Sequence, residues 1–265
     1  MTTIGGRVLS APAQDYLETI YNITVEGDAV VSARLAEKFG ISPASVSEML
    51  QRLQRDGYLI LDRAQGPRLT AEGAAAAERS LRKHRLAERF LFEILGMDWI
   101  TAHEEAHDFQ HAMSSAIEAR LVAVLGNPTT CPHGNPIPGS APNTLDFLRA
   151  HQAHRLSDAP EQTHLTVLCI SEVVEDETAL LRYLGEKGIK PKAHIIIQDA
   201  GPGKAGPLTL VLANQTVALE RAVADKVWVY RSAESTPLRA SSTMQSPPHL
   251  LIQAQAQEKR ILISP

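Results

Sequence analysis

The chain has 265 residues, of which 44% are hydrophobic and 21% are charged, and its formal net charge is -4. This balance is ordinary for a folded globular protein and argues against one that coats nucleic acid without sequence preference. Because no apolar run reaches the roughly 20 residues that span a bilayer, and the start lacks the basic-then-apolar order of a signal peptide, we expect a cytoplasmic protein without a membrane segment.

The first 70 residues combine helices and a hairpin in a recognisable order. Apolar spacing and turn residues predict helices over 12–26, 31–40 and 44–55 and strands over 57–62 and 68–70. Ser32 is the expected cap of the second helix, and Gly40 is expected to end it. A helix, a helix-turn-helix pair and a hairpin wing together indicate a winged-helix DNA-binding module.

In such a module the second helix of the pair enters the major groove, while hydroxyls, amides and arginines contact phosphates. The outward-facing candidates for DNA contact on that helix and the wing are Ser42, Pro43, Ala44, Ser45, Ser47, Gln51, Arg52, Arg63 and Arg68. Residues 1–75 hold seven Lys or Arg and nine Asp or Glu, so the module is not basic overall and modest affinity per dimer is expected. A winged helix used only for protein contacts is the alternative.

Histidines are concentrated on the next two predicted helices. An alanine-rich helix over 70–95 carries His84 and Glu88 one turn apart. A second helix, from about 98 to 125, carries His103, His107 and His111 at four-residue steps, which places them within roughly 80° of one another. Imidazole is the commonest metal ligand, so the two helices could converge on metal, although a solvated polar flank is the plainer interpretation.

The rest of the chain changes character. Residues 126–139 are rich in Gly, Pro and Asn and predict irregular structure, and later short strands around one helix predict a compact barrel. Two isolated cysteines, Cys131 and Cys169, are too few for a disulfide framework or a thiolate zinc site, so any metal should be held mainly by nitrogen and oxygen. The expected domains are 1–73 (winged helix), 74–145 (helical), 146–162 (linker), 163–232 (barrel) and 233–265 (flexible tail).

Three stretches resemble the diphtheria toxin repressor and manganese transport regulator family of metal-dependent repressors. They are Lys83-His-Arg-Leu-Ala-Glu-Arg89, the segment from His103 to Ser114, and Cys131-Pro-His-Gly-Asn-Pro-Ile-Pro-Gly139. The resemblance covers about residues 1 to 230. It implies a mainly helical protein with a small β part: an N-terminal winged helix, a helical dimerisation and metal-binding domain, and a C-terminal SH3-like barrel of the FeoA type.

The resemblance also implies two metal sites. The primary site would use Asp15, His107, Gln110 and His111, and the ancillary site would use His84, Glu88 and His103, with Glu177 from the barrel as a candidate fourth ligand. Glu18 matches a carboxylate of the manganese-responsive branch. His107 stands where that family has Cys or Glu, Gln110 replaces a usual Glu, and Leu180 replaces a second ligand from the barrel.

Oxygen and imidazole donors without a thiolate suit Mn(II) or Fe(II). We expect Mn(II) first and Fe(II) next, with Zn(II) or Co(II) possible in vitro. The hypothesis is a homodimeric repressor that binds a double-stranded DNA operator of metal-homeostasis genes when metal bridges the first helix to the helical domain. The two recognition helices would then be about 34 Å apart, as successive major grooves require.

Two other functions stay open at this point. A His/carboxylate metallohydrolase would need an open coordination position and a general base, for which Glu104 or Glu105 could serve. A winged-helix regulator that responds to a small organic ligand would make the histidines incidental. The winged helix speaks against the enzyme, and metal analysis of untagged protein would separate the second alternative.

Overall fold

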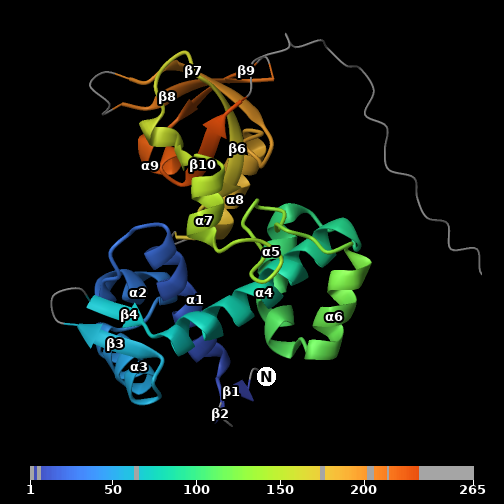
Figure 1. Cartoon of the computed structure of the whole chain (residues 1–265). Coiled ribbons are helices and arrows are strands. Elements are labelled where there is room, and N and C mark those ends of the chain that lie inside the picture. Colours follow the sequence, from blue (N-terminus) through green and yellow to red (C-terminus); the bar gives the residue numbers. More distant parts are fainter. Residues whose placement is uncertain are drawn as a thin grey trace, which may run out of the picture. The chain divides into compact units, whose positions relative to one another are not determined.

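The computed structural model describes residues 3–4, 7–62, 66–173, 177–201, 206–213 and 215–232 (Figure 1). Arg63 of the predicted wing turn and the predicted tail over 233–265 lie outside these residues. Among the described residues, no helix is both long and apolar enough to cross a membrane.

The N-terminal part has the predicted order of elements. Its elements are β1 (Thr3–Ile4), β2 (Arg7–Val8), α1 (Ala11–Val25), α2 (Ser32–Phe39), α3 (Pro43–Arg55), β3 (Leu59–Asp62) and β4 (Gly66–Leu69). Strands β3 and β4 pair in antiparallel register, with Leu59 opposite Leu69. A helix pair followed by a hairpin wing therefore forms as the turn residues and apolar spacing predict.

The two helices of the pair begin differently. Ser42 caps α3, because its hydroxyl accepts the Ser45 amide at 3.1 Å. The prediction that Ser32 caps α2 is wrong: Ser32 is the first helical residue, and the cap position is held by Val31, which has no side-chain hydrogen bond to offer. Gly40 ends α2 at φ 61°, a left-handed conformation that glycine adopts without steric cost.

Buried apolar side chains hold this part together. Leu17 and Ile20 of α1 pack with Leu35, Val46 and Leu53 of the helix pair in one core, and all five are buried. A core of this kind fixes α3 against α1, because close-packed side chains leave no room for sliding. Any constraint on α1 is therefore passed to the helix expected to read DNA.

Three helices follow, and they differ from the prediction at one point. They are α4 (Ala71–Glu93), α5 (Trp99–Ala112) and α6 (Ser115–Val124). The helix predicted from about 98 to 125 is broken, because Met113 adopts an extended conformation and Ser114 caps α6 by accepting the Ile117 amide. The Met113 carbonyl accepts a 2.6 Å hydrogen bond from Lys83 of α4, a tertiary contact that helix periodicity does not reveal.

The segment 126–139 is irregular, as expected, and is anchored on the barrel. A Cβ at Gly134 would lie 2.1 Å from the Leu168 carbonyl oxygen, and Gly134 has a φ of 87°. Only glycine fits this approach. The Cys131–His133 turn is thereby held against the strand that contains Leu168.

The C-terminal part is a six-stranded antiparallel sheet in the order β5-β10-β6-β7-β8-β9. Its elements, with the preceding helix, are α7 (Thr144–Ala150), β5 (His154–Arg155), a 3-10 turn (Leu156–Asp158), β6 (His164–Ile170), α8 (Glu177–Glu186), β7 (His194–Asp199), β8 (Leu208–Leu212), β9 (Gln215–Leu219), α9 (Arg221–Ala224) and β10 (Val227–Arg231). The elements α7, β5, β9 and α9 were not predicted. Trp99 at the start of α5 is part of this sheet's core, so α5 is packed against the barrel.

Candidate metal centre and nucleic-acid interface

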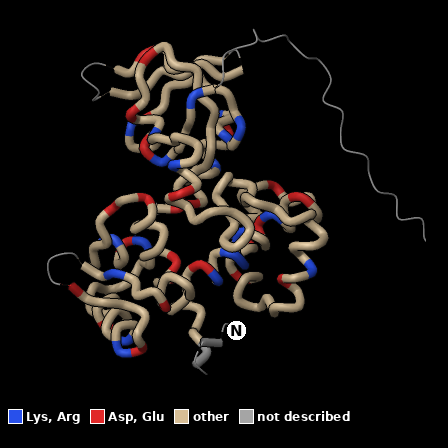
Figure 2. Tube along the Cα trace, in the orientation of Figure 1, with Lys and Arg blue, Asp and Glu red and all other residues tan. Residues whose placement is uncertain are grey.

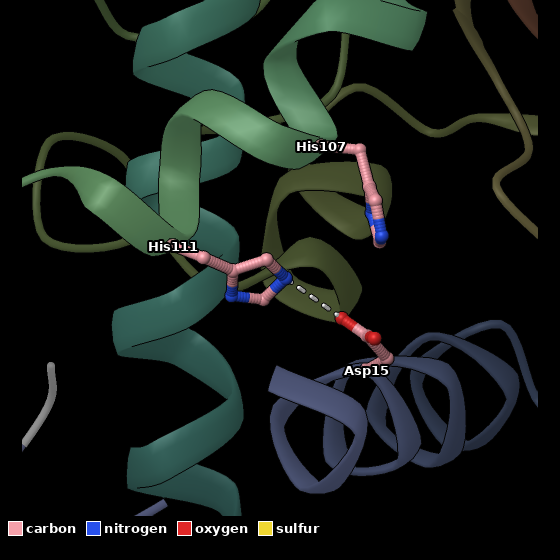
Figure 3. A group of neighbouring side chains, drawn as sticks. All are labelled: Asp15, His107 and His111. Carbon is pink, nitrogen blue, oxygen red and sulfur yellow. Dashed lines mark ion pairs between the residues drawn. The ribbon is translucent and has the colours of Figure 1, made fainter. Parts of the chain in front are cut away.

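Three predicted ligands from two helices meet between α1 and α5 (Figure 3). His107 and His111 extend from α5 toward Asp15 on α1, and His111 Nε2 lies 3.2 Å from Asp15 Oδ1. One ligand atom from each of the three residues lies within 4.8 Å of the others. Since metal–ligand bonds are about 2 Å long, donors at this separation can share one ion after small side-chain movements.

Glu18 and Gln110 extend this group. The Gln110 amide nitrogen lies 3.4 Å from Glu18 Oε1, to which it donates, and 3.3 Å from His111 Nε2. Its amide oxygen is buried and has no hydrogen-bond partner among the described residues. An unpaired buried oxygen is costly. The structure therefore brings Glu18 and the four predicted primary-site residues together, and leaves Asp15 Oδ1 and Gln110 Oε1 without a hydrogen-bond partner among the described residues.

The electrostatics of this group suit the binding of a cation. Burial raises the pKa of Asp15, although His107 and His111 oppose the shift, and burial raises the pKa of Glu18 to about 7. Burial lowers the pKa of His111, because the charged imidazolium is also poorly solvated there. Both carboxylates thus lack a sufficient counter-charge within the protein. A divalent cation would supply that charge and a partner for the Gln110 oxygen.

A second cluster surrounds Glu88 of α4, whose side chain is 1% exposed. Its Oε1 atom lies 3.2 Å from His84 Nε2, 2.8 Å from His103 Nδ1 and 3.1 Å from His133 Nδ1. Its Oε2 atom and His84 Nδ1 are buried without a hydrogen-bond partner among the described residues. The predicted ligands His84, Glu88 and His103 therefore do converge, with donor atoms left unused.

Glu177 of α8 lies at the edge of this cluster. Its Oε2 atom is 3.7 Å from His103 Nε2. Leu180, one turn later on the same helix, packs against the barrel core and provides no donor atom. The barrel therefore brings one carboxylate to the cluster, as the sequence predicts.

Sequence reasoning missed two members of the second cluster. Cys131 and His133 form a further group with Glu88 in which ligand atoms lie within 4.8 Å of one another, and all three residues are buried. The spacing Cys-Pro-His was visible in the sequence, but neither residue was assigned to a metal. The interpretation that the cysteines are too isolated considered sequence neighbours only, whereas the fold brings Glu88 to them.

Histidines compensate the negative charge of the Glu88 carboxylate. Burial alone would raise the pKa of Glu88, but His133 and His84 hold it well below its usual range, helped by hydrogen bonds from His103 and His133. Burial likewise opposes the charge on His103, yet Glu177 and Glu88 raise its pKa to about 9. In contrast to Asp15 and Glu18, the Glu88 carboxylate has its counter-charge within the protein.

A cavity of about 640 Å³ connects the two clusters. Its walls include Asp15, Glu18, His84, His103, His107 and Glu177. Because α1, α4, α5 and α8 all line it, ions held here would touch elements of all three parts of the chain.

The expected DNA-contact residues lie on one exposed helix and the wing. On α3 they are exposed from the Ser42 cap to Arg52, and Arg68 is exposed on β4. Val46 and Leu50 of the same helix are buried, so α3 has one face in the core and one free. Figure 2 shows Lys and Arg interspersed with Asp and Glu along the described part of the chain.

Comparisons with known proteins agree with this architecture. Three family models match: iron dependent repressor, N-terminal DNA binding domain, over residues 8–66; iron dependent repressor, metal binding and dimerisation domain, over 70–139; and FeoA domain, over 154–231. The iron-dependent repressor IdeR of Mycobacterium leprae is 35% identical over 81% of this chain and 94% of its own. The chain belongs to the iron-dependent repressor family.

Further relatives support this assignment. The diphtheria toxin repressor of Corynebacterium diphtheriae is 42% identical over 69% of this chain and 83% of its own. A solved structure titled manganese-dependent transcriptional repressor complex with manganese has a TM-score of 0.70 and 31% identity, and the match covers 83% of this chain and all of that one. The manganese regulator SloR matches with a TM-score of 0.71 and 26% identity over 83% of this chain and 98% of its own.

The chain is therefore a metal-dependent, DNA-binding transcriptional repressor and not an enzyme. The predictions of family, fold class and repressor function are confirmed. The hydrolase alternative, with Glu104 or Glu105 as general base, finds no support, because this family consists of DNA-binding regulators.

Proposed function

We propose that this repressor binds its operator as a homodimer when Mn(II) or Fe(II) is held between α1 and α5. The observation that carries the proposal is the approach of Asp15 on α1 to His107 and His111 on α5. Glu18 and Gln110 would complete the donor set. The ion would supply the positive charge that the two α1 carboxylates lack.

The chain's own part in the mechanism is to connect α1 to the reading helix. Leu17 and Ile20 of α1 share a core with Val46 and Leu53 of α3, so holding α1 also holds α3. Without a counter-charge, the carboxylates of Asp15 and Glu18 favour solvent over the cavity, and α1 is free to leave α5. Operator binding and metal binding would then strengthen each other, because both select the same arrangement.

The metal preference follows from donor chemistry. Carboxylate, amide oxygen and imidazole suit Mn(II) and Fe(II), and we place Mn(II) first because Asp15 and Glu18 both offer hard oxygen donors. Zn(II) and Co(II) would also bind in vitro, since affinity for nitrogen donors rises along the first transition row. The second cluster, which adds the Cys131 sulfur, would accept softer ions more readily.

The homodimer would form through the helical part. Five large apolar side chains near the end of α4 and on α6 are exposed: Phe92, Ile94, Leu95, Ile117 and Val124. Exposed large apolar side chains of this kind suit burial in a symmetric interface. The family model that matches residues 70–139 is described as a metal binding and dimerisation domain.

The test is DNA binding as a function of buffered free metal. The probe is a duplex selected by the wild-type protein from a random-sequence library in the presence of Mn(II), and Mn, Fe, Co and Zn are each titrated. We expect tight binding with Mn(II) or Fe(II), loss on chelation, and loss in His111→Ala. His164→Ala, an exposed histidine of the barrel, is the matched control and should bind as the wild type does. Equal binding of the duplex with and without chelator would refute metal activation.

A further inference from the structure

The barrel contacts the DNA-binding part directly through a short segment that follows β6. This barrel strap consists of residues Ser171–Val173. Val173 is 3% exposed and belongs to the N-terminal core, whose other buried members all lie between Ala13 and Leu81. Arg34 of α2 also lies with its Nη2 atom 3.4 Å from the Val173 carbonyl oxygen, to which it donates. The strap therefore places a barrel side chain inside the core that holds α1 and α3 together.

Glu172 of the strap joins three elements. Its Oε2 atom accepts hydrogen bonds from Asn22 of α1 at 2.8 Å and from Arg85 of α4 at 2.7 Å, and its Oε1 atom accepts from Arg85 Nε at 3.1 Å. Arg85 is 1% exposed, so this bidentate pair lies in the protein interior. Burial opposes the charge on Glu172, but Arg85 holds its pKa below the usual value. Glu172 is thus a fixed acceptor to which the Asn22 end of α1 is tied.

Glu26, the residue that caps the C-terminal end of α1, also binds to the barrel. Glu26 Oε2 accepts a 2.7 Å hydrogen bond from the Ser171 hydroxyl and lies 3.0 Å from Arg155 Nη2 of β5. The side chains of Glu26 and Arg155 are 6% and 10% exposed. A buried pair with well-placed hydrogen bonds is strongly orienting, because moving one partner leaves the other charge unpaired.

These contacts lie C-terminal to the proposed metal ligands of α1, and the first of them, at Asn22, is one turn beyond Glu18. Asp15 and Glu26 are separated by 11 residues, or about 16 Å along a helix. We propose that the barrel strap, with Arg155, is a positioning clamp that holds the C-terminal end of α1 whether or not metal is present. The inference rests on the DNA-binding role of residues 8–66 and not on the assignment of metal ligands.

In this conformation the clamp contacts are formed and the predicted metal ligands lie close together. With α1 held by the barrel at Asn22 and Glu26, metal would have only the Asp15 end of a rigid helix to bring to α5. The clamp thereby reduces the conformational entropy that the protein loses when it binds the operator. A repressor without the clamp would need metal to restrain both ends of α1, and would bind its operator more weakly even at saturating metal.

The test compares Ser171→Ala/Val173→Ala with Ser157→Ala by amide hydrogen exchange in the chelated full-length protein. Ser157 is a buried serine whose hydroxyl donates to Asp225 within the barrel at 3.1 Å, so it is a matched control whose hydroxyl makes no hydrogen bond to α1. In the double variant we expect about tenfold faster exchange in the second half of α1 and in α2, as loss of a hydrogen bond to a charged group allows. The control should exchange as the wild type does.

Binding of the selected duplex at saturating Mn(II) provides a second measurement. The double variant should bind at least fivefold more weakly than Ser157→Ala. If the double variant does not fold by circular dichroism, Ser171→Ala and Asn22→Ala are measured singly. Wild-type exchange in α1 and wild-type duplex affinity in the folded variants would overturn the clamp. Failure of metal activation would instead appear in the wild type as insensitivity to chelator, and the exchange experiment would stand unchanged.

Discussion

The two ligand clusters beside α5 differ in how far the protein itself compensates the charge of their carboxylates. Around Glu88, three imidazoles surround one carboxylate oxygen, and the pKa of the carboxyl is held well below its usual range. Around Asp15, burial dominates and the pKa values of Asp15 and Glu18 are raised. The charge of the Glu88 carboxylate is therefore compensated within the protein, whereas the proposed cation would compensate the charges of Asp15 and Glu18. A metal sensor needs a site of the Asp15 kind.

The largest expected effect is on stability at the Glu88 cluster. Glu88→Gln removes the charge that His84, His103 and His133 share, and should lower the free energy of unfolding of the chelated protein by about 3 to 5 kcal/mol. Glu93→Gln, on the same helix and 38% exposed in its pair with Arg89, should lower it by less than about 1 kcal/mol. Urea denaturation measures both. Equal losses of stability in the two variants would mean that the charge of Glu88 stabilises the fold no more than an exposed ion pair does.

Asp15→Asn should leave the stability of the chelated protein nearly unchanged and should weaken its activation by Mn(II). Stability of the chelated protein should change by less than about 0.5 kcal/mol, because the charge removed is one that burial already disfavours. Activation by Mn(II) should fall by about 5- to 150-fold in affinity for the selected duplex, the range of a typical coupling between two sites. Asp146→Asn, whose side chain is 58% exposed on α7, is the control. Retained Mn(II) activation in Asp15→Asn would show that the Asp15 carboxylate is not needed at the metal site.

The cost of burying the Glu18 carboxylate should depend on pH. Its folded pKa, raised from 4.5 to about 7, means that the cost of ionising it in the folded state is absent below pH 4.5 and fully present above pH 7. In chelated protein Glu18→Gln should therefore be more stable than the wild type by about 1 to 3 kcal/mol at pH 8 and by much less at pH 5. Glu48→Gln, exposed on α3, should show no such trend. The measurement is denaturation at the two pH values.

The smallest expected effect concerns the sulfur donor near Glu88. Cys131→Ser should weaken binding of one Zn(II) by about tenfold and leave Mn(II) affinity within about twofold, because thiolate favours the softer ion. Competition with a metal indicator on chelated protein measures both. Cys169→Ser, also buried but outside the ligand groups of the described residues, is the control. Equal Zn(II) affinity in the two variants would exclude Cys131 as a donor.

Much of this molecule could be predicted from local sequence. The four-residue spacing of His103, His107 and His111 already placed three imidazoles on one side of a helix, and turn residues predicted the helix pair and wing. The resemblance to metal-dependent repressors added Asp15 and Glu18, which lie about 90 residues earlier and carry no local signal of a metal site. The break at Met113 was missed, although Ser114 offers a local cap signal, and the hydrogen bond from Lys83 to the Met113 carbonyl joins residues 30 positions apart.

The sequence by itself determined which side chains share a face of α1, α4 or α5, because helical geometry depends only on residue spacing. Only the tertiary structure decided that Cys131 and His133 reach Glu88, and that Glu172 and Ser171 hold the end of α1. These groups come from segments up to 150 residues apart. Their meeting depends on how the loop at Gly134 and the barrel strap pack against the helices, and no spacing rule within one element encodes that packing.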